Sequence, residues 1–422
     1  MTIHTPAKSS RLINATPFFY GWIILLGGTI GIVMMGPSQT FTIGVFIDSF
    51  IADLGISRSN ISLIYGLATL AASLLLPVTG RCVDRYGARR MVLVIGLGLG
   101  LACLGLSLAQ GVVTLFFGLL AARFLGFGSL QMVSNYVIAQ WFIRQRGRVM
   151  GLAGLSLAAS LVIFPTLGQY LIERFDWRLA WVILGGLVWG VVLPVGWLLY
   201  RDKPELYGLR PDGGPYSPAE ANLQTASEEN WTLAEARQTG AFWIFGAALT
   251  TLTMLLAGLV FHQISLFEGR GLSREVAVGT FNVIALFSVV GNLGMGWLLD
   301  RYSARLMLAT TLLLLAVTLV LAQVMATPGQ ARLYGAIQGL ITGSFRVIDS
   351  VVWAKYFGRL HLGSIRGAVM IGVVGGTALG PYPLGLSLDY LGSYTPALTS
   401  LLILPLGIGL ITLLLKRPSK QT

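Results

Sequence analysis

The chain has 422 residues, of which 55% are hydrophobic and only 11% are charged. Soluble globular proteins carry roughly 25% charged side chains, so this composition excludes a protein whose main solvent is water. The formal net charge of +12 does not indicate nucleic-acid binding, because the Lys and Arg residues fall in short clusters between apolar runs. We therefore expect a multi-pass membrane protein.

Twelve apolar runs recur along the chain, and each approaches the roughly 20 residues that a helix needs to cross a bilayer. The predicted fold is all-α, with 12 transmembrane helices in two six-helix bundles related by pseudo-two-fold symmetry. The first run is too long for the apolar region of a cleaved signal peptide, so we expect it to remain as a span. The spans are predicted at 20–47, 59–80, 91–110, 112–138, 147–172, 178–199, 239–267, 275–298, 304–326, 330–355, 363–389 and 395–415.

Polar segments divide the chain into expected domains. The linker at 201–238 is the longest polar stretch, and we expect a short amphipathic helix near its end, around 231–237. Bends are expected at Pro165 in the fifth span and around Gly380 and Pro383 in the eleventh. The domains are an N-terminal tail at 1–19, a bundle at 20–200, the linker, a bundle at 239–415 and a C-terminal tail at 416–422.

The distribution of Lys and Arg predicts the orientation, because cytoplasmic loops hold an excess of these residues. With the N-terminus inside, 21 of the 29 fall in cytoplasmic segments and six fall outside. We therefore expect an inner (plasma) membrane protein with both termini in the cytoplasm. Arg123 and Arg346 are the two that remain deep within spans, away from the span ends.

Short motifs repeat between the two halves. Gly55-Ile-Ser-Arg58 is matched 216 residues later by Gly271-Leu-Ser-Arg274. Asp-Arg-Tyr at 84–86 returns at 300–302, and a third pair follows in the same order at 141–150 and 356–370. Three such pairs indicate an internal duplication. An even number of spans in each half keeps both halves in the same orientation.

A loop motif follows the second span in each half. The first copy is Gly80-Arg-Cys-Val-Asp84-Arg85-Tyr-Gly-Ala-Arg89-Arg, and the second has Ser303 in place of Gly87. The motif resembles the loop signature of the major facilitator superfamily. That resemblance implies a latch that closes the cytoplasmic side in the outward-facing state; the alternative is that these charges only obey the positive-inside rule. The expected gating residues are Gly80, Asp84, Arg85, Arg89, Asp300 and Arg301.

The acidic residue of the signature also has a direct physical interpretation. A carboxylate at Asp84 can accept hydrogen bonds from the N-terminus of a facing helix, where the partial positive charge favours an anion. Within the superfamily, the segments at 141–151 and 356–367 resemble the bacterial monocarboxylate transporter and oxalate-formate antiporter group. That group often places an arginine in its eighth span, whereas this chain has Asn282 and Asn292 there.

Arg346 and Asp349 are the leading candidates for a transport site, because charges inside membrane helices are costly and are functional by default. Their spacing places them on one helix face, close enough to pair. If a substrate carboxylate binds Arg346, the proton affinity of Asp349 should rise, so substrate and proton would load together. The alternative is an internal ion pair that only fixes helix packing. The superfamily resemblance implies that the first, fourth, seventh and tenth spans line the central path.

Other polar residues join the candidate set. Arg123 in the fourth span is either a substrate or proton-relay arginine or a cation satisfied by backbone carbonyls. An offset of 215 maps Gln131 onto Arg346, which favours polar positions in both halves around a shared cavity. His262 is more readily read as a solvated or interfacial residue than as a proton relay. The remaining expected substrate-binding residues are Asn135, Gln39 and Asn282.

The leading prediction is a secondary transporter of small organic anions, with monocarboxylates favoured and protons as the coupling ion. The alternatives are a proton-linked exporter of amphipathic compounds and, in another class, a transporter-like membrane sensor. No nucleophile, base or metal cluster converges, so we do not expect an enzyme or a cofactor. The expected partners are a small-molecule substrate, protons and the lipid bilayer, without nucleic acid, and the expected state is a monomer.

Overall fold

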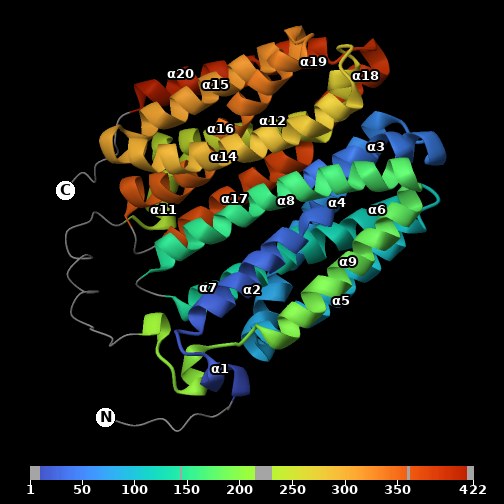
Figure 1. Cartoon of the computed structure of the whole chain (residues 1–422). Coiled ribbons are helices and arrows are strands. Elements are labelled where there is room, and N and C mark those ends of the chain that lie inside the picture. Colours follow the sequence, from blue (N-terminus) through green and yellow to red (C-terminus); the bar gives the residue numbers. More distant parts are fainter. Residues whose placement is uncertain (1–9, 143–144, 214–230, 359–361, 416–422) are drawn as a thin grey trace. The chain divides into compact units, whose positions relative to one another are not determined.

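The computed structural model describes residues 10–142, 145–213, 231–358 and 362–415. Within these ranges every regular element is helical (Figure 1). Contacts group the chain into two compact units, Met1–Ile43 with Ala71–Pro218 (unit 1) and Gly44–Leu70 with Ala219–Thr422 (unit 2). Residues 44–70, which form the last part of the first span and the first part of the second, therefore group with the second half of the chain.

The first half of the chain forms six spans. Eleven helices of the described chain are long and apolar enough to cross a membrane, and six of them lie here. The elements are α1 (Arg11–Ala15), α2 (Gly21–Met34), η1 (Gly36–Ser38), α3 (Thr40–Leu54), α4 (Arg58–Tyr86), α5 (Ala88–Ser107), α6 (Val112–Ala122), η2 (Arg123–Leu130), α7 (Gln131–Trp141), α8 (Arg146–Arg174) and α9 (Trp177–Leu198).

The linker and the second half follow. Helix α16 is 30 residues long and supplies the twelfth span. The elements are η3 (Pro204–Tyr207), η4 (Pro211–Gly213), α11 (Leu233–Arg237), α12 (Gly240–Phe261), α13 (Gln263–Glu268), α14 (Arg274–Arg301), α15 (Ala304–Val324), α16 (Pro328–Phe357), α17 (Leu362–Leu379), α18 (Pro381–Leu391), α19 (Thr395–Leu401) and α20 (Ile403–Leu414). The predicted all-α fold with twelve spans is confirmed.

The first span is a discontinuous helix. Pro37 lies in a short 3-10 turn between α2 and α3, where a proline cannot donate a backbone hydrogen bond. The Thr42 hydroxyl donates to the Gly36 carbonyl at 2.6 Å and so satisfies one acceptor at the break. Of the predicted bends, the eleventh span is interrupted at Gly380, whereas α8 runs through Pro165 without interruption.

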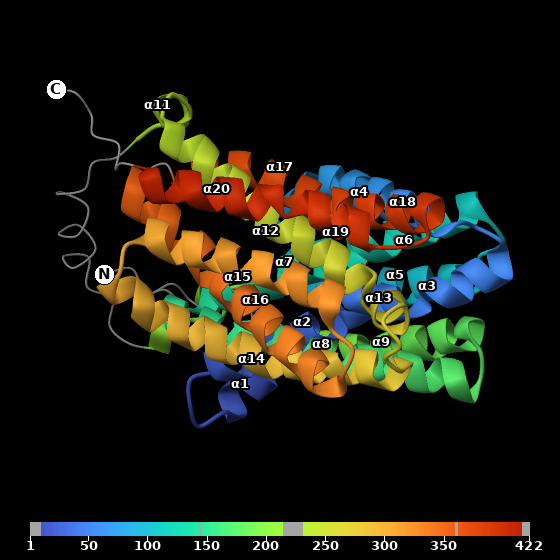
Figure 2. The same ribbon diagram turned by 90° about the horizontal axis from the view of Figure 1, so that it is seen from above.

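In unit 1, α5 packs along α9, and Figure 2 shows the same pair from above. Small residues allow this close approach, because a Cβ at Gly185 would lie 3.0 Å from the Gly100 carbonyl oxygen. At its start, α9 is capped by the Asp176 carboxylate, which accepts the Leu179 N–H at 2.7 Å. Near the start of α5, next to the first loop motif, a Cβ at Gly196 of α9 would lie 2.8 Å from Val92 Cγ1.

In unit 2, α14 and α16 make the most extensive helix contact. Gly335, Gly339 and Gly343 recur every four residues on α16, and a Cβ at any of them would meet atoms of α14. Gly291 on α14 approaches the backbone of α16 in the same way. Close helix packing of this kind replaces the hydrophobic effect as the source of stability within a bilayer.

The predicted helix near the end of the linker is present as α11. Its capping box is complete, because Thr232 and Glu235 accept each other's backbone N–H groups. Just before it, the Trp231 backbone donates to the Phe357 carbonyl at 2.9 Å, and the two rings meet edge to face. The end of the linker is therefore anchored to the last turn of α16.

Candidate transport site

Asp349 on α16 forms a salt bridge with Arg366 on α17. Arg366 Nη2 lies 2.6 Å from Asp349 Oδ2, and Trp353, one turn further along α16, donates from Nε1 to Oδ1 at 3.2 Å. Both carboxylate oxygens are thus occupied. The predicted pair between Arg346 and Asp349 is wrong, because a shared helix face does not bring the two groups into contact and α17 supplies a closer cation.

Arg346 is left without a polar partner among the residues that the structure describes. It is half-buried in the second half of α16. A guanidinium carries five N–H donors and no acceptor, and it stays charged in proteins. A partner for this charge within a membrane helix is expected, because an isolated one is costly there. The site therefore has the chemistry to accept a carboxylate.

Arg123 lies in unit 1 and serves the break in the first span. It is 1% exposed, and its Nη1 donates to the Ser38 carbonyl at 2.9 Å. Its guanidinium also lies over the Phe127 ring, 4.0 Å from the centroid. Arg123 begins the π-helical segment η2, an irregularity often found at functional sites. These contacts match the backbone-carbonyl alternative for this residue.

The other predicted substrate residues have different surroundings. Gln39 follows the break and is 6% exposed, with its Nε2 buried and unbonded within the described chain. Gln131 and Asn135 are half-buried on α7. Asn282 is exposed on α14, one turn from the exposed Leu286, and is not joined to the Asp349 group.

His262 is fully buried, which corrects the expectation of a solvated or interfacial residue. Its Nε2 lies 2.8 Å from the Pro381 carbonyl oxygen, which can only accept, so Nε2 carries the proton. The Tyr394 hydroxyl lies 3.3 Å from Nδ1 and donates to it. The chain turns between α12 and α13 at this histidine, and α18 covers it.

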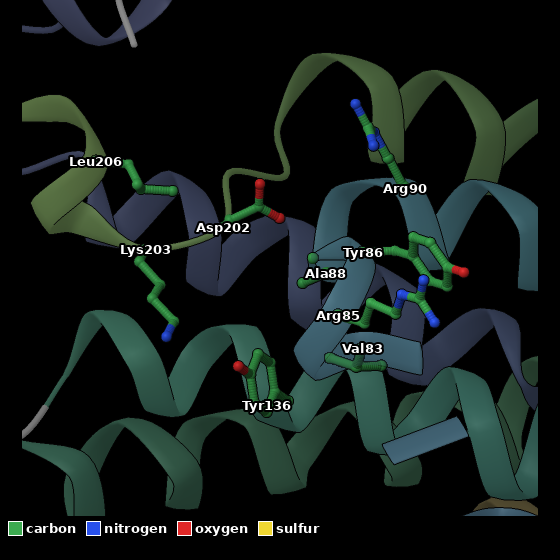
Figure 3. A pocket seen from close by; sticks show the side chains of 10 residues that line it. Val83, Arg85, Tyr86, Ala88, Arg90, Tyr136, Asp202, Lys203 and Leu206 are labelled. Carbon is green, nitrogen blue, oxygen red and sulfur yellow. The ribbon is translucent and has the colours of Figure 1, made fainter. Parts of the chain in front are cut away.

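The first loop motif is built around a capped helix start. Gly87 has a φ of 85°, a conformation that favours glycine, and a Cβ there would lie 2.5 Å from Asp202 Oδ1. The same oxygen accepts the Arg89 backbone N–H at 3.1 Å, so Asp202 caps α5 from beyond the end of α9. Figure 3 shows Asp202 beside Ala88 at this helix start.

In the second motif, the helix start is capped by a residue of the motif itself. Ser303 has a φ of −69°, and its hydroxyl accepts the Leu306 N–H at 3.4 Å, so it caps α15 itself. The difference between Gly87 and Ser303 is therefore a difference in the source of the cap.

A basic residue of each motif clamps the last span of its own half. Arg89 Nη2 donates to the Trp197 carbonyl at the end of α9 at 2.8 Å. Arg305, 216 residues later, donates to the Leu415 carbonyl after α20 at 2.6 Å. A cation is favourable at a helix C-terminus because of the free carbonyls there. Sequence reasoning treated Arg89 only as part of a gate and missed this role.

The remaining predicted gating residues lie around these helix starts. The Arg85 guanidinium lies over the Tyr86 ring, 5.3 Å from its centroid, and the Arg301 guanidinium lies over the Trp297 ring at 3.9 Å. Gly80 has open space where a Cβ would lie. The side chains of Asp84 and Asp300 lie outside the described residues. Arg85 also lines a pocket with Arg90 and Lys203 at the turn between α4 and α5 (Figure 3).

The structure also contains a second cluster of charged residues, which the sequence analysis did not predict. Asp48 on α3 bonds both Arg58 and Arg274, the two arginines of the repeated Gly-x-Ser-Arg motif. The repeat itself was the available signal, although the sequence does not reveal their shared partner. Among the described residues, no group of three His, Cys, Asp or Glu side chains is arranged to hold a metal ion.

Twelve spans, a duplicated loop motif and charged groups inside membrane helices define a multi-pass transporter. The sequence profile of the Major Facilitator Superfamily matches residues 28–294, and the chain belongs to this family. It therefore carries a small-molecule substrate across a membrane.

Relatives and a solved structure agree with this assignment. The chain is 23% identical over 369 residues to "Uncharacterized MFS-type transporter YhjX" of Escherichia coli (strain K12), covering 83% of this chain and 84% of the relative. It is 23% identical over 422 residues to monocarboxylate transporter 12 of Rattus norvegicus, covering 92% and 84%. A bacterial homolog of the human lysosomal transporter Spinster superposes with a TM-score of 0.69 at 16% identity, covering 94% of this chain and 96% of that chain, and shows the shared fold.

Proposed function

We propose that this protein is a secondary active transporter of small organic anions, with monocarboxylates as the favoured class. The observation that carries the proposal is the Arg346 guanidinium, which is half-buried in a membrane helix and has no polar partner in the described chain. A guanidinium binds a carboxylate through two parallel hydrogen bonds, so a small organic acid is its natural ligand. The similarity to a protein named monocarboxylate transporter 12 supports the same class.

Transport would follow alternating access, in which two six-helix bundles rock about the substrate. We place the protein in the inner (plasma) membrane with both termini in the cytoplasm, as the Lys and Arg distribution predicts. Gln39, Gln131 and Asn135 would supply hydrogen bonds to the rest of the substrate, and Arg123 would hold the break in the first span.

Proton coupling would run through Asp349. The carboxylate is held by Arg366 and Trp353 in this structure. If movement of α16 during the cycle separates Asp349 from Arg366, a proton can replace the guanidinium as the partner of the buried carboxylate. Arg346 would bind the substrate and Asp349 the proton, one helical turn apart.

The test is uptake of labelled lactate, pyruvate and oxalate into proteoliposomes, with and without a pH gradient. Arg346→Ala should abolish uptake of the anion that the native protein carries, and Arg346→Lys should weaken it because the paired donors are lost. Arg332→Ala is the matched control, since it removes an exposed arginine from the same helix. Normal affinity in Arg346→Ala would remove this residue from the site. Uptake of amphipathic compounds instead of these acids would favour the exporter alternative.

The coupling step has a separate readout. Asp349→Asn should leave uptake that no longer responds to the pH gradient, because an amide cannot take up the proton. Glu205→Gln, an exposed carboxylate in the linker, is the control and should respond like the native protein. If Asp349→Asn still responds in full to the gradient, Asp349 is not the coupling residue.

A further inference from the structure

The repeated Gly-x-Ser-Arg motif forms the same helix start twice within unit 2. The glycine has a positive φ in both copies, 63° at Gly55 and 76° at Gly271, and so ends the preceding helix. The serine hydroxyl then accepts a backbone N–H three residues later, at 3.3 Å in the first copy and 3.4 Å in the second. Each arginine is therefore the first residue of its helix, Arg58 in α4 and Arg274 in α14.

An arginine in this position is electrostatically unfavourable. The N-terminus of a helix carries partial positive charge, which repels a cation and attracts an anion. Two copies of the same unfavourable placement call for a counter-charge. Asp48 on α3 bonds both arginines, and Arg274 has a second carboxylate partner in Glu268, whose Oε1 lies 3.5 Å from Arg274 Nη1. The position equivalent to Asp48 in the second half is Ile264.

The contacts at Asp48 are direct. Arg58 Nη2 bonds Oδ1, and Arg274 Nη1 lies 2.8 Å from Oδ2. Arg274 Nη2 also donates to the Val45 carbonyl at 2.8 Å. The Asp48 side chain is 30% exposed and those of Arg58 and Arg274 are 11% and 24% exposed, so the cluster is largely withdrawn from water. We call Asp48, Arg58 and Arg274 the Asp48 cluster.

A second anchor joins the start of α4 to α18. Asp389 Oδ2 accepts the backbone N–H of Ser59 at 2.7 Å, which places another carboxylate at this helix start. Nearby, a Cβ at Gly385 would lie only 3.0 Å from Ser59 Cα. The segment 44–70 is therefore seated on helices of the second half by charge at one point and by close packing at another.

Ser62 is buried next to this contact, so its accessibility can be used to measure whether the contact is closed. Its side chain is fully buried and lies 3.3 Å from His262 Nε2, and its hydroxyl donates to the Arg58 carbonyl at 2.8 Å. We therefore expect a water-soluble reagent to reach residue 62 when the segment 44–70 leaves the helices that cover it.

We propose that Asp48 is a positioning residue of the transport cycle, whose carboxylate closes this end of the protein by holding both repeat arginines. The proposal rests on the proposed function, because alternating access requires the first-half segment 44–70 to separate from second-half helices when this end opens. The Asp48–Arg274 salt bridge, which joins the segment 44–70 to α14, breaks in that step, whereas the Asp48–Arg58 salt bridge lies within the segment and stays. The partial exposure of the Asp48–Arg274 pair keeps the closure reversible, since exposed ion pairs contribute little free energy.

The experiment measures closure without any substrate. Ser62→Cys is introduced after replacement of Cys82 and Cys103, and the purified protein in lipid nanodiscs is treated with a water-soluble maleimide. Labelling should be slow with Asp48 present. Asp48→Asn should speed it at least about tenfold, the factor that corresponds to about 1.4 kcal/mol. Asp48→Glu should restore slow labelling, and the exposed-carboxylate control Glu275→Gln should not change it.

Unchanged labelling in Asp48→Asn would overturn the proposal. If that variant does not purify as a monodisperse protein, Arg274→Gln carries the test, because it removes the Asp48–Arg274 salt bridge that joins the segment 44–70 to α14 and should give the same direction of change. Rapid labelling of Ser62→Cys with Asp48 intact would also overturn it. The readout needs no transported anion, so failure of the anion uptake assay and failure of this assay are distinguishable.

Discussion

The Asp349 carboxylate and the Arg366 guanidinium, 17 residues apart, join α16 to α17 by a salt bridge of 2.6 Å. The Asp349 side chain is 14% exposed and that of Arg366 is 39% exposed, so the pair is buried on one side only. Solvent therefore screens the salt bridge on its exposed side and reduces its contribution to the free energy of unfolding.

Arg366→Gln should lower the free energy of unfolding of the purified protein by about 1 kcal/mol, because a half-exposed charge-assisted hydrogen bond is lost. In that background, Asp349→Asn should cost less than it does alone, since its partner is already gone. Denaturation midpoints of the two single variants and the double variant check this coupling. Strictly additive losses would mean that the two side chains act independently.

Arg123→Met should destabilise the first span by about 1–3 kcal/mol, because the Ser38 carbonyl loses its donor in a buried position. The total uptake rate should fall because less of the protein is folded, whereas the KM for the substrate should stay unchanged. This result would separate Arg123 from Arg346, for which the affinity should fall. A KM change in well-folded Arg123→Met protein would assign Arg123 to substrate binding instead.

Gly380→Ala should destabilise the break between α17 and α18 by about 1–3 kcal/mol, the usual cost of overpacking. A methyl group there would collide with the Met254 carbonyl oxygen of α12. Gly375→Ala is the matched control on α17, because no atom lies within 4 Å of the added Cβ. There, the substitution should be neutral or stabilising by up to about 1 kcal/mol. Equal melting temperatures for the two variants would contradict this account.

The two loop motifs should respond differently to alanine. Ser303→Ala removes a local cap and should cost about 0.5–2 kcal/mol, whereas Ser303→Gly should cost only a few tenths. Gly87→Ala should cost more than Ser303→Ala, because it adds backbone strain and a clash with Asp202. Thermal unfolding of the three variants tests this order. If Gly87→Ala is the mildest, the long-range cap does not govern this loop.

The spans were predictable because hydropathy and length alone determine them. The break at Pro37 was not, since Gly36, Pro37 and Ser38 lie within an apolar run that reads as one helix. Pro165 lies inside α8, which continues through it as one helix. In a membrane helix, neighbouring groups decide whether the freed carbonyl is satisfied, and the sequence does not show them.

The candidate site was predictable in its residues but not in its pairing. The cost of charge in a bilayer points to Arg346 and Asp349 without any structure. Arg366 lies near the start of the predicted eleventh span, where it was counted with the cytoplasmic cations, and it proves to lie in the second turn of α17. The choice between Arg346 and Arg366 as the partner of Asp349 depends on where α17 lies against α16, and periodicity along one helix carries no information about that.

The two ways of capping α5 and α15 set a different order of events during synthesis. Ser303 and Leu306 are three residues apart, so the start of α15 is complete as soon as that turn is made. The Asp202 cap of α5 joins residues 113 apart. During synthesis, the cap at the start of the third span therefore forms only after the sixth span has been made, so this loop is completed last in the first half of the protein.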